Sequence, residues 1–249
     1  MLDQTGQVVH AEDAGRVQPT ASLGKLFLLY AVADAVTTGT LAVSDRVGRP
    51  TEAVQDSGLW QHLDVDELSL GDAAVLVASV SDNLAANALF DAIGPEAIDA
   101  AAEALGCQQS RLIDRIRDVR RAEHPPAPSI GRADELAEAV RRIELAGTTS
   151  PAAATVRSWL LTGVDLSMVG SAFGLDPLAH VTPDRRMTLW NKTGTDTTIR
   201  ADVGVLRGPD HWLAYAALAQ WDSTDDARDA ALARMRDLGH HLRTRVQGS

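Results

Sequence analysis

One apolar segment limits the possible folds of this chain more than any other. Residues 26–36 contain a single charged side chain, Asp34. Such a run predicts a helix, and a helix that is apolar on nearly every side has to be covered by other elements all round. Ser22 and Lys25 stand at its start. Because they are three residues apart, their side chains are expected on one helix face within mutual reach.

Ser22 and Lys25 form a Ser-x-x-Lys pattern that suggests a nucleophile with its own base. Ser22 is expected in the first helical turn, where free N–H groups and the helix dipole favour negative charge. The chain has 23 lysines and arginines, of which only Lys25 and Lys192 are lysines. A buried lysine can lose its proton and act as a base, whereas arginine cannot. Lysine therefore occurs where an amine is required, unless a coding bias left two incidental lysines.

Two further polar tripeptides lie at the ends of predicted elements. Ser81-Asp82-Asn83 separates two predicted helices over residues 68–80 and 84–93. All three of its residue types cap helices well, so an N-cap is the alternative interpretation of this tripeptide. Lys192-Thr193-Gly194 follows a predicted strand over residues 187–191.

The remaining pattern predicts helices in the middle of the chain and strands towards both ends. Strands are expected at residues 7–11, 201–206 and 212–220, and further helices at residues 95–105, 131–146, 150–161 and 225–246. We predict an α/β (α+β) fold in which helices flank an antiparallel sheet. The sheet domain comprises residues 1–18 and 181–249, residues 19–180 form an inserted all-α domain, and the active site lies in the cleft between them.

The three motifs in this order resemble the signature of class A β-lactamases and penicillin-binding proteins. The similarity runs from about residue 2 to the end of the chain, and it implies the β-lactamase and transpeptidase fold. It also implies that Ser22 becomes acylated and that Lys25 takes its proton or holds the network that does. Ser81 would pass a proton to the leaving nitrogen, and Asn83 would hydrogen-bond the substrate amide and Lys25.

The same resemblance assigns residues that bind the substrate. Lys192 and Thr193 would hold a substrate carboxylate, and Arg200 matches the position of a carboxylate-binding arginine in many members. The backbone N–H groups of Ser22 and Thr195 would form the oxyanion hole. The substrate-binding residues implied in this way are Asn83, Thr193, Gly194, Thr195 and Arg200.

Two features depart from the family pattern. Class A enzymes use a loop glutamate to activate the water that hydrolyses the acyl-enzyme, and Arg117 stands at the matching position here. Asp118 and Glu123 are the nearest carboxylates, but neither has the expected spacing. Without a general base, acylation can proceed while deacylation stalls. The second departure is at the N-terminus, since Met1 falls near the end of the family's usual first strand.

The composition of the chain limits the kinds of partner that we expect it to bind. The net charge of −11 argues against nucleic acid and anionic membranes, both of which need a basic surface. The single cysteine, Cys107, allows no internal disulfide, and no cysteine–histidine cluster has metal-ligand spacing, so we expect neither a metal nor a cofactor. No apolar run is long enough to span a membrane, and no signal peptide is recognisable. We expect a cytoplasmic monomer, or a periplasmic or secreted one if a leader has been removed.

The sequence therefore predicts a class A β-lactamase-like serine hydrolase that forms an acyl-enzyme on Ser22. Its substrate would be a small acyl compound with a carboxylate, either a β-lactam or a related amide or ester, and deacylation would be slow. One alternative is an intracellular amidase, esterase or acyltransferase that acts on another acyl substrate. A second alternative is a non-catalytic ligand-binding relative, but a binding site could use arginine at both lysine positions.

Overall fold

Three long strands near the C-terminus form the centre of the fold in this computed structural model, which describes residues 1–52, 54 and 57–247. The strands β7 (Thr188–Asp196), β8 (Ile199–Arg207) and β9 (Trp212–Gln220) are antiparallel neighbours. The short strand β1 (Leu2–Asp3) pairs with β9, so the sheet order is β1-β9-β8-β7. The predicted antiparallel sheet is confirmed, and β9 has the predicted bounds.

Two of the strand predictions are wrong in their extent. The strand expected at residues 7–11 does not form, and Val8 makes only an isolated bridge to Leu2. The chain turns there because the Asp3 side chain accepts hydrogen bonds from the N–H groups of Thr5 and Gln7. β7 does not end at residue 191 but continues to Asp196. Lys192-Thr193-Gly194 therefore lies within the strand and pairs with β8.

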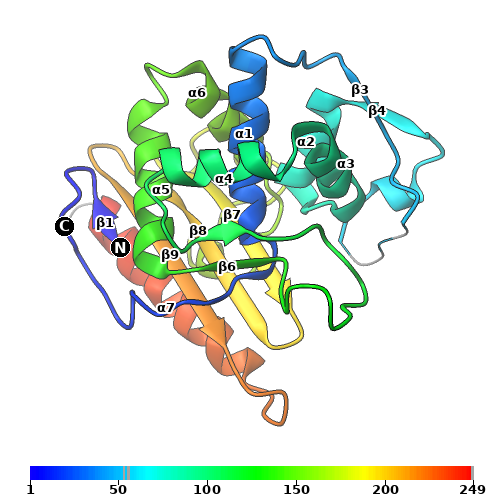
Figure 1. The fold of residues 1–249 in the computed structure, drawn as a ribbon. Coiled ribbons are helices and arrows are strands. Elements are labelled where there is room, and N and C mark those ends of the chain that lie inside the picture. Colours follow the sequence, from blue (N-terminus) through cyan, green and yellow to red (C-terminus); the bar gives the residue numbers. More distant parts are fainter. Residues whose placement is uncertain (53, 55–56, 248–249) are drawn as a thin grey trace.

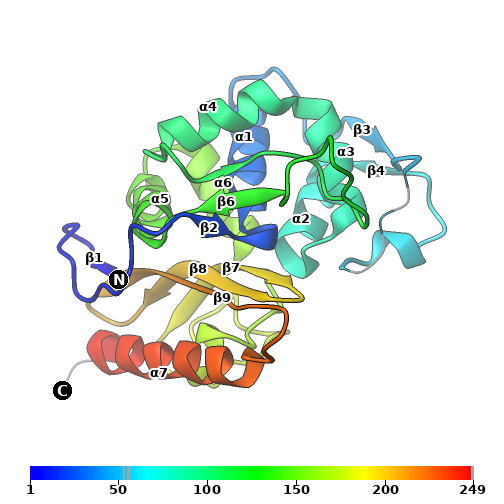
Figure 2. The ribbon, with the colours of Figure 1, turned by 60° about the horizontal axis from the view of Figure 1, so that its bottom comes forward.

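Helices cover both faces of the sheet (Figure 2). The long helix α7 (Arg228–Gln247) packs on one face of β8 and β9, and α5 (Ala133–Ala146) packs on the other. Side chains alternate between the two faces along each strand, as strand geometry requires. Val205 accordingly joins the core on the α5 side, whereas the next residue, Leu206, joins the core under α7.

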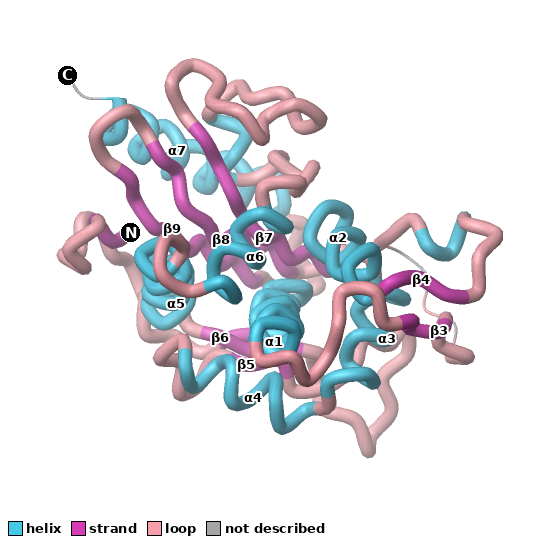
Figure 3. Tube along the Cα trace, turned by 90° about the horizontal axis from the view of Figure 1, so that it is seen from above, coloured by secondary structure: helices cyan, strands magenta, loops and turns pink. Residues whose placement is uncertain are grey.

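The apolar helix α1 (Lys25–Thr37) stands in the middle of the helical layer (Figures 1 and 3). It contacts α2 (Leu70–Val80), α3 (Asn83–Ile93), α4 (Pro95–Ala104) and α6 (Pro151–Leu160). Its residues 26–29 are at most 1% exposed. The prediction of burial on nearly every side is therefore confirmed. The predicted bounds of α2–α7 agree with the structure to within three residues.

Short elements complete the fold around the start of α1. A three-stranded sheet is formed by β2 (Gln18–Pro19), β6 (Ser129–Gly131) and β5 (Arg111–Leu112), and a hairpin-like pair by β3 (Arg46–Gly48) and β4 (Glu67–Ser69). The described residues also form the 3₁₀ helices η1 (Ala21–Gly24), η2 (Trp60–His62) and η3 (Val169–Ala172). The division into a sheet domain and an all-α domain stays a prediction. The two predicted parts are in direct contact, since α5 packs on the sheet and η3 packs on α7.

Asp82 ties the turn between α2 and α3 to the neighbouring loop. It is 1% exposed, and one carboxylate oxygen caps α3 by accepting from the N–H of Ala85 at 2.9 Å. The other oxygen accepts from the N–H groups of Leu59 and Trp60 at 2.7 and 2.8 Å. The N-cap interpretation of Ser81-Asp82-Asn83 is therefore correct for its middle residue.

We expect Asp82→Ala to lower the free energy of unfolding by about 3 kcal/mol. The substitution removes an N-cap worth about 1 kcal/mol and leaves the buried N–H of Trp60 and the part-buried N–H of Leu59 without their acceptor. Urea denaturation followed by circular dichroism measures this loss. The control is Asp72→Ala, which removes an exposed acid from the first turn of α2 and should cost less than about 1 kcal/mol. Equal stability of the two variants would contradict the role of Asp82.

Candidate active site

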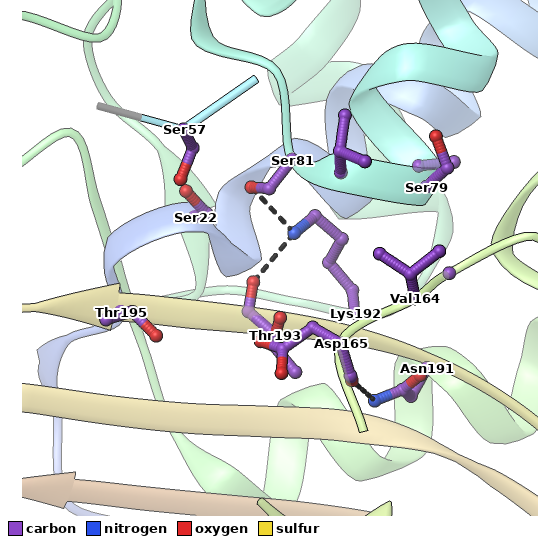
Figure 4. A pocket seen from close by; sticks show the side chains of 13 residues that line it. Ser22, Ser57, Ser79, Ser81, Val164, Asp165, Asn191, Lys192, Thr193 and Thr195 are labelled. Carbon is purple, nitrogen blue, oxygen red and sulfur yellow. Dashed lines mark hydrogen bonds between the residues drawn. The ribbon is translucent and has the colours of Figure 1, made fainter. Parts of the chain in front are cut away.

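A cavity of about 170 Å³ opens where the helical layer meets β7 (Figure 4). It is bounded by the end of α2, by the segment that follows α6, and by β7. The predicted site residues that line it are Ser22, Ser81, Lys192, Thr193 and Thr195. Residues far apart in the sequence are thus brought to one place, as the three motifs predicted. Lys25 lies behind Ser81 and donates a hydrogen bond to it, and Asn83 accepts one from Lys25.

Ser22 lies in the 3₁₀ helix η1 and not in the first turn of α1, which corrects the sequence prediction. Two strands hold this turn from opposite sides. The Ser129 hydroxyl of β6 donates to the carbonyl of Ala21. On the other side, a Cβ atom at Gly194 of β7 would lie 2.3 Å from the carbonyl oxygen of Thr20 and 3.1 Å from the Ser22 nitrogen. Only glycine allows the strand to come so close.

The Lys25 amine is completely buried and has three acceptors. Its Nζ donates to the carbonyl of Ser81 at 2.6 Å, to Oδ1 of Asn83 at 2.7 Å and to Oγ of Ser81 at 3.2 Å. Burial, followed by the positive charge of Lys192, holds the pKa of Lys25 well below its ordinary value, although Asp82 opposes this. Among the hydrogen bonds of the described residues, Lys25 bonds to Ser81 and Asn83 and none joins it to Ser22, with which the sequence placed it within mutual reach.

Lys192 approaches the same serine from the sheet. Its Nζ donates to Oγ of Ser81 at 3.0 Å and to the carbonyl of Thr193 at 2.7 Å (Figure 4). Burial lowers the pKa of Lys192 to about 8, against the charges of Asp165 and Asp202, which raise it. The Ser81 hydroxyl therefore stands between two amines with lowered pKa values. The backbone of Ser81 is left-handed, with a φ of 57°, which is uncommon outside glycine.

The Arg200 guanidinium is held by backbone carbonyls, and its binding of a substrate carboxylate stays a prediction. Its guanidinium donates to the carbonyls of Asp196 and Ile199, both at 2.7 Å, and lies over the ring of Trp221. Arg200 pairs with Thr195 across the strands, so both side chains start from the same face of the sheet. Thr195 lines the cavity, whereas Arg200 is not among its described lining residues.

The loop around Arg117 contributes no carboxylate to the described lining of the cavity. The Arg117 guanidinium is paired with Asp114 at 3.1 Å and with Glu52 at 3.2 Å. Asp118 and Glu123, the nearest alternative acids, are exposed. Slow deacylation for want of a loop glutamate therefore stays a prediction.

Sequence reasoning missed two acids and an amide around Lys192. Asp165 lines the cavity, and Asn191 donates to Asp202 at 3.0 Å behind it. Asp202 is completely buried, and burial raises its pKa to about 7, although Asn191, Tyr215 and the N–H of Val169 donate to it. A charged residue inside an otherwise apolar strand could have pointed to Asp202. Asp165 had no such signal, because only the fold brings it to the cavity.

Within residues 1–52, 54 and 57–247, no three histidine, cysteine or acidic side chains gather as metal ligands would. Over the same residues, no helix is both long and apolar enough to cross a membrane.

Comparison with known proteins gave one family and many similar folds. The profile of the family described as "Beta-lactamase enzyme family" matches residues 2–242. A β-lactamase from Sphaerobacter thermophilus superposes with a TM-score of 0.80 at 25% identity, covering 95% of this chain and 87% of that one. A β-lactamase from Xanthomonas campestris gives 0.77 at 22% identity, covering 98% and 90%. No curated protein sequence matches the chain.

A third similar structure is that of a variant of PBP-A, described as an acyl-enzyme complex with penicillin G. It superposes with a TM-score of 0.75 at 19% identity and covers 91% of this chain and 81% of that one. At this identity the likeness, like that to the Xanthomonas protein, concerns the fold alone.

The two lysines can be titrated directly, because the chain contains no others. We expect two lysine signals in an NMR titration of protein with ¹³C-labelled lysine side chains. One should titrate near pH 8 and belong to Lys192, and the other well below the ordinary value and belong to Lys25. A Lys192→Arg variant assigns the signals by removing one. Two titrations near the ordinary lysine value would contradict the buried arrangement.

The same pKa shift fixes the sign of a stability effect. An unfolded lysine keeps its proton up to about 10.5, whereas folded Lys192 loses it near 8. Between these values the unfolded chain binds more protons, so the contribution of Lys192 to the free energy of unfolding rises with pH. The rise should be smaller in the Lys192→Arg variant, which keeps only the part due to the lowered pKa of Lys25, when the two proteins are compared by urea denaturation across that window. An equal rise in both proteins would assign it to other groups.

Proposed function

The chain belongs to the beta-lactamase enzyme family, and on that premise we propose that it is a serine hydrolase that forms an acyl-enzyme on Ser22. The observation that carries the proposal is the meeting of Ser22, Ser81 and Lys192 at one cavity, with the Lys25 amine buried behind them. Burial of two amines costs free energy, and a site that only bound a ligand would have little use for their lowered pKa values.

In the proposed reaction the Ser22 hydroxyl attacks the carbonyl carbon of an amide or ester. The proton of that hydroxyl passes to the amine of Lys25, whose lowered pKa favours the neutral form that can accept it. The carbonyl electrons move onto oxygen, and the backbone N–H groups of Ser22 and Thr195 stabilise the resulting oxyanion. The closeness of β7 to η1 at Gly194 supports this pairing of the two N–H groups.

The second half of acylation breaks the bond to the leaving group. As the carbonyl forms again, the leaving nitrogen or oxygen needs a proton, and the Ser81 hydroxyl supplies it. Lys25 then returns a proton to Ser81, with which it shares a hydrogen bond of 3.2 Å. Lys192 also donates to Ser81, so its positive charge favours transfer of the Ser81 proton outward to the leaving group. Asn83 fixes the Lys25 amine and is proposed to bind the substrate amide.

Hydrolysis of the acyl-enzyme is proposed to be slow. Activation of a water needs a base close to the ester carbonyl, and Arg117 pairs with Asp114 and Glu52 where the family has its glutamate. Among the described residues of the cavity lining, Asp165 is the one acid, and it lies on the Lys192 side.

A second candidate function is that of an acyltransferase, in which a stable acyl-enzyme awaits a nucleophile other than water. The same absence of a base for water activation favours this candidate.

Ser22→Ala should abolish acylation. We expect a covalent adduct on the native chain after mixing with penicillin G methyl ester or p-nitrophenyl acetate, and none on the variant. Intact-protein mass spectrometry over minutes to hours measures both the adduct and its decay. A long-lived adduct fits slow deacylation, and a transient one means that another base activates water. An adduct that persists on Ser22→Ala would exclude this serine as the nucleophile.

Lys25→Arg should slow acylation about as strongly as Lys25→Ala, by roughly 10²- to 10⁴-fold. Arginine retains the charge but cannot accept the Ser22 proton, so the comparison separates a base from a simple cation. The rate of adduct formation is the measured quantity, and the thermal midpoint of each variant shows whether it is folded. A folded Arg variant that keeps most of the rate would refute the assignment of Lys25 as the base.

A further inference from the structure

The cavity contains an acid that none of the three motifs includes. Asp165 follows α6 and lines the cavity beside Lys192 and Thr193 (Figure 4). One of its carboxylate oxygens, Oδ1, accepts from the hydroxyl and the N–H of Ser167 at 2.6 and 3.1 Å. These bonds fix the side chain through one oxygen. The Thr193 side chain also hydrogen-bonds to the carboxylate, which links it to the cavity wall formed by β7.

The carboxylate of Asp165 is ionised and is coupled to the cations on this side of the site. Partial burial raises its pKa, but hydrogen bonding by Ser167 and Thr193 and the charge of Lys192 outweigh burial, so the pKa is lowered. Asp165 in turn opposes the fall in the pKa of Lys192 and of Arg200, which burial lowers in both cases. It therefore acts on all three groups that the family resemblance assigns to a substrate carboxylate.

We propose that Asp165 takes, from within the protein, the place of the substrate carboxylate, so that the substrate is an acyl compound that is uncharged beside Lys192. This inference rests on the proposed function and defines its substrate class. The carboxylate of Asp165 already acts on the charge of Lys192 and is hydrogen-bonded by the Thr193 side chain. A carboxylate entering beside these groups would meet a like charge in the cavity wall.

The size of this effect is large enough to measure. Two carboxylates a few ångströms apart near a protein surface repel by an amount equivalent to at least tenfold in affinity. A neutral amide or ester avoids that repulsion. Asp165 is an acceptor, so it favours a substrate that presents an N–H or O–H group at this side of the cavity. We expect neutral amides and esters with such a donor to be the preferred acyl donors.

Asp165 also has a purely structural interpretation, because aspartate two residues before serine often forms a turn. A residue that only held the turn would be indifferent to the charge of a ligand in the cavity. Asparagine keeps the Oδ1 acceptor for Ser167 and removes the charge. Asp165→Asn therefore separates the two interpretations, and Asp210→Asn, an exposed acid in the β8–β9 turn, makes the same change of net charge elsewhere.

The first experiment uses acetate as a carboxylate probe and needs no acylation. In protein with ¹³C-labelled lysine, at a pH where Lys192 is protonated in both proteins, acetate should leave the Lys192 signal of the native chain unchanged. In Asp165→Asn it should shift that signal saturably, with at least tenfold tighter apparent binding. Asp210→Asn should behave as the native chain does. Equal acetate binding by native and Asp165→Asn protein would overturn the proposal.

The second experiment compares two acyl donors with the same scissile bond. The native chain should be acylated at least tenfold faster by penicillin G methyl ester than by penicillin G, as followed by intact-protein mass spectrometry. Asp165→Asn should reduce this preference at least tenfold. A native preference for penicillin G itself would overturn the proposal without any variant. If neither donor nor p-nitrophenyl acetate acylates Ser22, the proposed function fails, and the acetate titration still decides the role of Asp165.

Discussion

Two buried amines that converge on one hydroxyl are the constraint on which the rest of the site depends. Lys25 and Lys192 both donate to Ser81, one from the helical layer and one from the sheet. Their charges oppose each other, and burial opposes both. The arrangement is tolerable because carbonyl groups and Asn83 accept the remaining amine protons, and because acids lie around Lys192. Helices and sheet have to be packed together before either amine has its partners.

The Ser-Asp-Asn tripeptide shows how chemistry and architecture share a short segment. Asp82 faces away from the cavity and joins α3 to the Trp60 loop, which is a task of folding. Its two neighbours face the Lys25 amine. The left-handed backbone of Ser81 separates these directions and ends α2 at the same time. One turn therefore supports the helices on either side and presents polar groups to the cavity between them.

Much of this could be predicted from the sequence, because local patterns decide helices and ordered motifs decide a family. The apolar run behind Ser22 predicted a buried central helix, and β9 was predicted to the residue. The prediction failed where contacts between distant segments decide. The Ser22 turn is 3₁₀ because β6 and β7 hold it, and β7 extends past Lys192 because β8 continues beside it. Asp165 acquires its meaning only from neighbours that are distant in the sequence.

The contacts of β6 and β7 with η1 have a consequence for which substitutions the chain tolerates during evolution. Ser22 is held between Ser129 on one side and Gly194 on the other, in the turn that leads into α1. Helix surfaces and loops are free to drift as long as these two strand segments keep their distance from the turn. The β-lactamase from Sphaerobacter thermophilus superposes with a TM-score of 0.80 at only 25% identity. Such a similarity of fold is what we expect when the position of the serine depends on a few close contacts. Geometry is inherited at a few close approaches, and the substrate preference can change around them.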